Sequence, residues 1–287
     1  MSTIAFLGTG LLGSAFVEAA CGRGDTVRTW NRTRAKAERL MSFGATVHDT
    51  PAEAVRGAER VHLVLQADAS VDEVISALRP GLAPGAVIVD HTTTLPAATA
   101  ARAARLEAQH LEYLHCPVFI GPPAARKGEG IIMACGPRAR FERVRPALER
   151  QAQRLEYLGE RPDLAAVYKL CGNALIIGLG ALVADVLSIG AAEGVAPADT
   201  MKLMDFFNAQ GIVTGRGRRM AAGDFEATFE LTMARKDVGL MVETAGPLPL
   251  ALLPALAARM EALIAAGHGQ QDLGVLAADA IAAARAH

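Results

Sequence analysis

The sequence has 287 residues, of which 51% are hydrophobic, and its 29 basic and 30 acidic residues give a formal net charge of −1. The high hydrophobic fraction excludes a disordered chain. The balanced charge provides no field that would attract nucleic acid or an anionic membrane, so we expect neither as a partner. At about 150 residues per domain, the length favours two domains.

The four cysteines predict no metal site, because they form neither a CxxC pair nor the spacing of a zinc module. We interpret Cys21, Cys116, Cys135 and Cys171 as small buried side chains in a reducing compartment. The N-terminus starts with a strand pattern and lacks a basic region, so we predict no signal peptide and a cytoplasmic protein. The longest apolar stretch, 174–184, is shorter than the roughly 18–20 residues of a membrane span, and we predict a buried helix there.

The first part of the chain alternates predicted strands with predicted helices. Apolar runs indicate strands at 3–8, 26–30, 45–48, 61–65, 87–89 and 111–118, and helices at 11–22, 33–41, from 51, from 70, and at 96–109. Two further strands, 131–135 and 154–158, flank a charged helix at 138–151. Such alternation with short connections is typical of a parallel sheet covered by helices on both faces. We therefore predict a doubly wound Rossmann domain of the α/β class over residues 1–161.

From residue 162 the pattern becomes entirely helical. Pro162 and Asp163 are typical of a helix start, and Gly194 is typical of a helix end, which predicts one helix of about 30 residues. Further helices are predicted at 197–208, 230–246, 248–266 and 270–286, which makes 162–287 an all-α domain for substrate binding and dimerisation. The apolar helix is longer than a domain of about 125 residues can cover, so we expect a homodimer.

Two groups of side chains in this helical domain receive structural interpretations. The arginines Arg216, Arg218 and Arg219 are separated by glycine, and we predict that they lie in a solvated loop or make a local anion contact. We assign Met201, Met204, Phe206 and Phe207, which have helical spacing, to the core or the lining of a substrate pocket.

A glycine motif follows the first predicted strand and opens the first predicted helix. It reads Gly8-Thr9-Gly10-Leu11-Leu12-Gly13, which is GxGxxG in the context that a dinucleotide site requires. The first glycine permits the tight turn, the second lets the pyrophosphate approach the backbone, and the third lets the helix pack on the strand. The free N–H groups of the helix then attract the phosphates.

The end of the second predicted strand distinguishes NAD from NADP. An NAD site usually has a carboxylate there that holds the ribose 2′-hydroxyl. This chain has Asn31, Arg32 and Thr33 instead. The Arg32 guanidinium can bind a 2′-phosphate and stack on adenine, and Asn31 and Thr33 add hydrogen bonds. We therefore predict NADP(H) as the cofactor.

With these motifs the chain resembles the β-hydroxyacid dehydrogenases, the group that contains 3-hydroxyisobutyrate dehydrogenase and glyoxylate/succinic semialdehyde reductases. The resemblance covers nearly the whole chain. Beyond the first two motifs it rests on three segments, which are Asp90-His91-Thr92-Thr93-Thr94-Leu95-Pro96, Lys169-Leu170-Cys171-Gly172-Asn173 and Lys236-Asp237-Val238-Gly239-Leu240.

The resemblance implies roles for residues in these segments. It implies that Lys169 is the acid/base and that Asn173 and Lys236 help to hold substrate and cofactor. It places Thr92 and Thr93 near the nicotinamide ribose. It also implies an oxidoreductase that transfers a hydride between NADP(H) and a small carbonyl or hydroxy compound, such as a 3-hydroxy acid, an aldehyde or a keto acid.

One segment departs from the family. Where the family has Ser-Gly-Gly to hold a substrate carboxylate, this chain has Phe119, Ile120 and Gly121, so the carboxylate pocket is expected to be reshaped. The same segment, with 157–159 and 165–168, is similar to imine reductases of the same superfamily, which makes imine reduction the alternative activity. Those enzymes usually have Asp or Tyr at the position of Lys169. The third hypothesis for the function is a non-enzymatic protein that binds the cofactor.

The chemistry of the reaction explains why a lysine suits position 169. A hydride transfer leaves one proton to be moved, which requires a group with a tunable pKa at the substrate oxygen. Lys169 lies in the most apolar predicted helix, where loss of water lowers the pKa of an amine. Asn173 lies one turn further and shares its face. Considered without the family, a lysine that extends from the helix edge into solvent explains the pattern equally well.

Overall fold

The structure, a computed structural model, describes residues 2–286. The chain divides into two compact units, Met1–Asn173 and Ala174–His287, each described separately below. The predicted domain boundary at 161/162 precedes the long helix α8 (Leu164–Ala192), whose first ten residues belong to the first unit.

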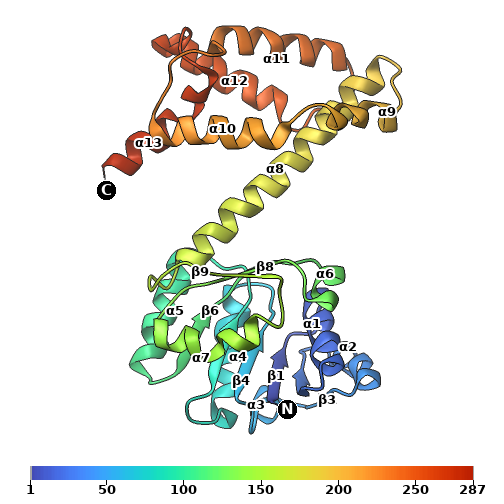
Figure 1. Cartoon of the computed structure of the whole chain (residues 1–287), viewed down its shortest axis with the longest axis vertical. Helices are drawn as coiled ribbons and strands as arrows, with labels where there is room; N and C mark the ends of the chain where they lie inside the picture. The colour runs from blue at the N-terminus through green and yellow to red at the C-terminus, as the bar shows by residue number, and fades with distance from the viewer. Residues whose placement is uncertain (1, 287) are drawn as a thin grey trace. The chain divides into compact units, whose positions relative to one another are not determined.

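A parallel sheet of six strands forms the centre of the first unit (Figure 1). Residues of β1 alternate between its faces, since Ile4 and Phe6 join one buried cluster and Ala5 and Leu7 join the other. Both faces are covered, which explains why the central strands β1 and β5 are mostly apolar. The strand order is β3 (Thr46–Val47), β2 (Thr26–Trp30), β1 (Thr3–Leu7), β4 (Arg60–Leu63), β5 (Val87–Asp90) and β6 (Glu112–His115).

Helices of this unit pack on both sides of the sheet, so the predicted doubly wound Rossmann domain is confirmed. One face is covered by α1 (Leu11–Gly22) and α7 (Arg138–Leu148), and the other by α3 (Pro51–Val55), α4 (Asp68–Leu78) and α5 (Pro96–Ala108). The remaining helices are α2 (Arg34–Glu38), α6 (Pro122–Lys127) and the 3₁₀ segments η1 (Arg39–Phe43) and η2 (Arg79–Gly81).

The single strand predicted at 111–118 is two strands in two sheets. After β6 the chain breaks at Cys116-Pro117, and β7 (Val118–Phe119) pairs with β8 (Ile131–Ala134) in a second sheet, completed by β9 (Arg154–Tyr157). Proline explains the break because it has no N–H to donate to a sheet. Phe119, the last residue of β7, lies beside the first part of α8, where its ring contacts Gly172.

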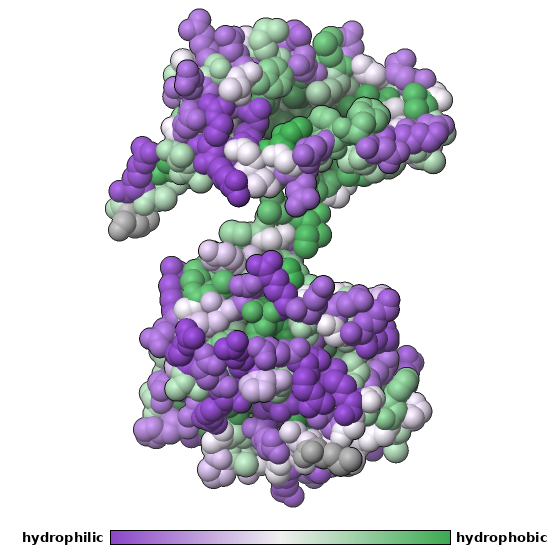
Figure 2. Space-filling view, viewed as in Figure 1, coloured by the Kyte–Doolittle hydropathy of each residue, from purple (hydrophilic) through white to green (hydrophobic). Residues whose placement is uncertain are grey.

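The apolar residues of α8 are exposed, so the predicted burial at 174–184 is wrong for the single chain. Ile177 is 70% exposed, and Leu175 and Ile176 are more than half exposed. Figure 2 shows green, hydrophobic side chains on the surface of α8. Among the described residues, α8 is the one helix whose length and composition would suffice to cross a membrane, because its 29 residues extend well beyond the apolar stretch that we considered.

The second unit is helical, as predicted. Its core includes Leu231, Val238, Leu253 and Met260. Both carboxylate oxygens of Asp185 in α8 accept backbone N–H groups at the start of α12, from Leu252 at 2.9 Å among others. After α8 its elements are α9 (Pro197–Met201), η3 (Lys202–Asp205), α10 (Ala209–Ala222), α11 (Leu231–Ala245), α12 (Leu253–Leu263), a π-helical turn (Ile264–His268), η5 (Leu273–Ala277) and α13 (Ala278–Arg285).

Three interpretations of side chains require correction. The arginines lie in helix α10 and not in a loop, whereas the alternative prediction of a local anion contact is met by the ion pair of Arg216 with Asp272. The aromatic pair Phe206 and Phe207 is exposed, with Met204, and does not join the core of this chain. Among the cysteines, Cys116 and Cys135 are buried as predicted, Cys21 is partly buried and Cys171 is exposed.

Candidate functional site

The site is a cavity of about 590 Å³ at the carboxyl ends of β1, β2, β4 and β5. This is the edge of an open α/β sheet at which ligands bind, and the volume suits a small-molecule cofactor. Most lining residues follow directly after a strand, and one comes from α8. They are Gly8, Gly10, Leu11, Leu12, Gly13, Trp30, Asn31, Arg32, Thr33, Lys36, Val64, Leu65, Gln66, Ser70, Glu73, Val74, His91, Thr92, Thr93, Val118, Ile120 and Lys169.

Each of the three motif glycines has a distinct steric setting. Gly8 has φ +99°, and a Cβ there would lie 2.2 Å from the Val64 carbonyl oxygen. A Cβ at Gly13 would lie 2.0 Å from the Gly8 carbonyl oxygen, so these two glycines are required by the turn and by the packing of α1. A Cβ at Gly10 would meet no atom within 4 Å. Space is therefore open at the N-terminus of α1, which has no side-chain cap and no acidic residue in its first turn. These features fit a dinucleotide pyrophosphate.

The end of β2 is tied to the glycine turn by Asn31. Its side-chain oxygen accepts the Thr9 backbone N–H at 3.0 Å, and its amide donates to the Thr33 carbonyl at 2.9 Å. Arg32 is exposed, lines the cavity and makes no ion pair within residues 2–286. By contrast, Arg34 is paired with both Glu38 and Asp49. Arg32 thus has a free guanidinium beside the turn.

A buried carboxylate at the end of β5 fixes the segment that follows this strand. Asp90 is fully buried and accepts the Thr92 backbone N–H at 2.9 Å and the Tyr113 hydroxyl at 2.8 Å. The Thr92 hydroxyl in turn accepts the Leu65 N–H at 3.1 Å. These bonds fix Thr92 and Thr93 in the cavity wall. The segment Asp90–Thr93 alone does not reveal the role of Tyr113, which comes from the neighbouring strand β6.

Lys169 enters the same cavity from the first turns of α8. Its ammonium lies 2.8 Å from the Asn173 side-chain oxygen and 4.3 Å from the centre of the Phe119 ring. The ring fits against the bare backbone of Gly172, where a Cβ would lie 2.1 Å from the Phe119 Cζ atom. Partial burial lowers the pKa of Lys169 below its ordinary value. The amine is therefore oriented by an amide, an aromatic face and a glycine.

His91 lies beneath the cavity in a buried polar chain. Arg60 donates to the His62 Nε2 at 3.1 Å, His62 Nδ1 lies 2.9 Å from His91 Nε2, and His91 Nδ1 lies 2.7 Å from the Cys116 carbonyl oxygen. Burial lowers the pKa of His91 to about 4, so its ring is neutral at physiological pH. The chain of bonds is typical of a structural role for His91.

The structure brings together most, but not all, of the predicted site residues. Phe119 and Asn173 contact Lys169 without lining the cavity, and Thr9 and Gly121 do not line it. Lys236 lies in the second unit, is exposed and is 3.0 Å from Asp237. Prediction missed the segment 64–66 after β4; its position at the carboxyl end of a central strand was the available signal.

The two halves of the chain match two family models that together cover the motifs of the cavity. Residues 3–159 match the NAD binding domain of 6-phosphogluconate dehydrogenase, and residues 164–278 match the NAD-binding domain of NADP-dependent 3-hydroxyisobutyrate dehydrogenase. The chain belongs to the β-hydroxyacid dehydrogenase family. As a member of this family it is an NAD(P)-dependent oxidoreductase. The cavity is called the cofactor cavity below, because its glycine turn and the open N-terminus of α1 fit a dinucleotide.

Similar proteins include members with several substrates. The chain is 27% identical to the 3-sulfolactaldehyde reductase of Escherichia coli over 284 residues. The alignment covers 95% of this chain and 93% of the relative. It is 26% identical over 296 residues to a probable mitochondrial 3-hydroxyisobutyrate dehydrogenase of Dictyostelium discoideum, covering 96% and 89%. An imine reductase from Myxococcus stipitatus in complex with NADP⁺ has the same fold, with a TM-score of 0.87 at 22% identity, covering 96% and 98%.

Proposed function

We propose that the protein is an NADPH-dependent reductase of small carbonyl compounds, or catalyses the reverse oxidation, with Lys169 as the acid/base. The observation that carries this proposal is the position of the Lys169 amine in the wall of the cavity that the glycine turn opens. No other lysine except Lys36 lines this cavity within residues 2–286, and Lys36 lies beside the end of β2.

The proposed chemistry requires one hydride and one proton. A bound nicotinamide supplies the hydride to the carbonyl carbon. The Lys169 ammonium donates its proton to the carbonyl oxygen, so the product is an alcohol and the lysine is left neutral. Asn173 accepts a hydrogen bond from the ammonium and directs its remaining protons toward the substrate. The lowered pKa of Lys169 makes this proton easier to give up near neutral pH.

The preference for NADPH over NADH rests on Arg32. A 2′-phosphate adds two negative charges that a free guanidinium can bind through charge-assisted hydrogen bonds. Arg32 and Thr33 line the cavity, and the end of β2 has no carboxylate that would repel a phosphate. The hydrogen bonds of Asn31 hold this segment in place, so we assign Asn31 a positioning role.

Imine reduction is the second candidate, and Phe119 is the observation that favours it. The aromatic ring occupies the space beside Lys169, and Ile120 lines the cavity. An apolar wall of this kind suits a substrate without a carboxylate, which an imine or a simple aldehyde can be. The imine reductases of the same fold add to this possibility.

A panel of aldehydes, keto acids and cyclic imines, assayed by NADPH oxidation, separates the two activities. We expect Lys169→Ala to lower kcat/KM by about 10²–10⁴-fold, the usual contribution of a general acid, while the Kd for NADPH changes little. Lys127→Ala, an exposed lysine outside the cavity, is the matched control. Full activity of Lys169→Ala would refute the acid/base role, and turnover of imines alone would favour the second candidate.

We further propose that the protein is a homodimer. The surface of α8 that Leu175, Ile176, Ile177, Leu179 and Leu182 form around the helix is apolar and exposed in the single chain, and a contiguous apolar surface of this kind marks an interaction site. A second copy of the same helix can cover it, and a two-fold interface requires such a self-complementary face. Light scattering that gives twice the mass of one chain would support this proposal.

A further inference from the structure

The segment 92–95, which follows β5, carries one exposed residue between two buried ones. Thr92 and Thr94 are buried, whereas Thr93 is exposed and lines the cofactor cavity. The side chain of Thr93 makes no hydrogen bond within residues 2–286. Its hydroxyl is therefore available both to donate a hydrogen bond to a ligand in the cavity and to accept one.

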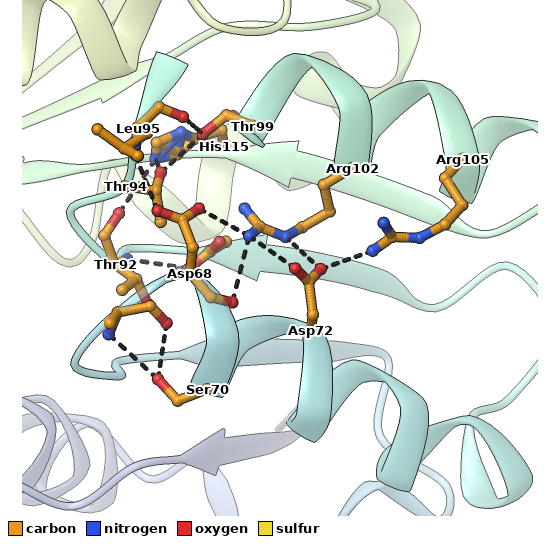
Figure 3. A network of polar contacts seen from close by, with 12 residues as sticks. Asp68, Ser70, Asp72, Thr92, Thr94, Leu95, Thr99, Arg102, Arg105 and His115 are labelled. Carbon is orange, nitrogen blue, oxygen red and sulfur yellow. Dashed lines mark hydrogen bonds and ion pairs between the residues drawn. The ribbon is translucent and has the colours of Figure 1, made fainter. Parts of the chain in front are cut away.

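His115, the last residue of β6, contacts both neighbours of Thr93. Its Nε2 atom lies 3.1 Å from the Thr92 carbonyl oxygen and 3.4 Å from the Thr94 hydroxyl (Figure 3). A carbonyl oxygen only accepts hydrogen bonds, so the contact with Thr92 requires a proton on Nε2. One N–H group of His115 thus reaches the residues on both sides of Thr93.

The hydroxyl groups beyond Thr94 agree with a proton on Nε2. The Thr99 hydroxyl donates to the Leu95 carbonyl oxygen at 2.9 Å, so the Thr94 hydroxyl donates to Thr99 at 2.7 Å and is left as an acceptor toward His115. Burial lowers the pKa of His115 to about 3, with further lowering by the charge of Arg102, so the ring is neutral at physiological pH. Its Nδ1 has no hydrogen-bond partner within residues 2–286, so every hydrogen bond of the ring goes to this segment.

The backbone of the segment is also fixed at its two ends. The Thr92 N–H donates to the Asp90 carboxylate at 2.9 Å, and the Leu95 N–H donates to the Asp68 carboxylate at 3.0 Å. The fully buried Arg102 lies 2.8 Å from the same carboxylate of Asp68 and orients it (Figure 3). Between these ends, His115 is the side chain that joins the two residues next to Thr93.

We propose that His115 is a positioning residue for the coenzyme, because its N–H group holds Thr92 and Thr94 and thereby keeps Thr93 in place to form a hydrogen bond with the coenzyme. His115 itself does not line the cofactor cavity, so it acts through Thr93 and not by contact. The inference rests on the proposed use of NADPH, but it does not depend on the substrate or on the role of Lys169.

The Kd for NADPH, measured by calorimetry, tests the inference without any turnover. We expect Thr93→Val to raise this Kd about fivefold, the usual size of one net hydrogen bond. His115→Met removes the N–H donor at similar volume and should raise the Kd by a similar factor. In the double variant the Kd should stay within about twofold of that of Thr93→Val, whereas independent effects would multiply to about 25-fold over wild type. Independent effects, or an unchanged Kd in His115→Met, would overturn the proposal.

Three further variants separate positioning from a general loss of stability. His115→Gln places an amide N–H near the position of Nε2 and should keep the Kd within about twofold of wild type. Leu114→Ala lowers the melting temperature, but it should leave the Kd unchanged, since Leu114 packs with Phe6 in a cluster on the other face of the sheet.

Thr94→Val tests the same contact if His115→Met does not fold, because it removes one of the two acceptors of the His115 N–H. We expect it to raise the Kd about twofold, and an unchanged Kd would overturn the proposal. The proposed reaction is tested separately by turnover. A protein that shows these Kd values but reduces no carbonyl or imine would contradict the proposed reaction and support the role of His115.

Discussion

At the scale of single residues, Lys169 is subject to two opposing influences. Partial burial lowers its pKa, because the charged form loses water. The face of the Phe119 ring, 4.3 Å from the ammonium, attracts the charged form instead. The balance decides whether the amine is protonated at a given pH. The aromatic ring, which stands where the resemblance implies a carboxylate-binding segment, thus also acts on the amine that we propose as the proton donor.

Replacing Phe119 with leucine should show how strongly the ring affects the pKa of Lys169. Leucine keeps an apolar wall but removes the π face, so the pKa of Lys169 falls. Reduction requires the ammonium form and is lost as pH rises through that pKa, so the alkaline limb of kcat moves to lower pH. A cation–π contact of about 0.5–1 kcal/mol corresponds to roughly half a pH unit or more. A pH profile of NADPH oxidation measures the shift, and an unmoved limb would show that the ring does not act on the amine.

We propose that the choice of coenzyme depends on Arg32. We expect Arg32→Ser to raise the KM for NADPH about 10–100-fold, since charge-assisted hydrogen bonds of about 1.5–3 kcal/mol are lost. The KM for NADH should change less than threefold. Arg34→Ser is the control, because Arg34 is already paired with Glu38 and Asp49. Equal effects of Arg32→Ser on both coenzymes would contradict an NADP-specific role.

At the scale of elements, the close approach of β7 to α8 depends on Gly172. Gly172→Ala would place a Cβ 2.1 Å from the Phe119 ring, which must then move away from Lys169. We expect a loss of about 1–3 kcal/mol in the free energy of unfolding, typical of overpacking, together with a lower kcat. Urea unfolding and steady-state kinetics measure the two effects.

Gly215 in α10 provides a matched control for this substitution. A Cβ there would meet no atom within 4 Å, so Gly215→Ala should keep or slightly raise the stability, because alanine favours a helix over glycine. A Gly172→Ala protein as stable and active as the Gly215→Ala protein would show that the Phe119 ring has room to move without consequence.

The elements differ in how far the sequence alone could predict them. The strands of the Rossmann domain were predicted within a few residues, since apolar runs bounded by glycine identify them directly. Helix α10 was missed because Gly211, Gly215 and Gly217 weaken its helical pattern. It forms nevertheless between an Asn208 cap, whose side chain accepts the Gly211 N–H at 2.8 Å, and a left-handed Gly223. Tertiary contacts such as Arg216 with Asp272 stabilise it and are invisible to local propensity.

In the candidate site, too, some residues were predicted from the sequence and others were found only in the structure. The glycine turn and Arg32 were predicted from the spacing of the dinucleotide motif, whereas Lys169 was predicted from the resemblance to the family. The contact of Phe119 with Gly172 was not, since it joins residues 53 positions apart through a second sheet that the sequence did not reveal. The contacts of His115 Nε2 with the Thr92 carbonyl oxygen and the Thr94 hydroxyl likewise could not be predicted, since they join residues more than 20 positions apart.

At the scale of the whole molecule, the apolar face of α8 requires an explanation. Its residues are exposed in the single chain, although each buried leucine or isoleucine side chain stabilises a protein by about 1.5–3 kcal/mol. A charge in this exposed apolar stretch of α8 should therefore oppose its burial against a second copy. Ile177, at 70% exposed, has room for such a change without disturbing the fold of one chain.

We expect Ile177→Asp to convert a dimer into a monomer with an unchanged far-UV circular dichroism spectrum. Burying an unpaired carboxylate in an apolar interface costs several kcal/mol, which exceeds what a two-fold contact can absorb at micromolar protein. Phe43→Asp changes an exposed aromatic residue of the first unit and should leave the dimer intact. Light scattering with and without detergent measures the mass. A dimeric Ile177→Asp protein would contradict the interface, and a wild-type chain that sediments with lipid vesicles would assign α8 to a membrane instead.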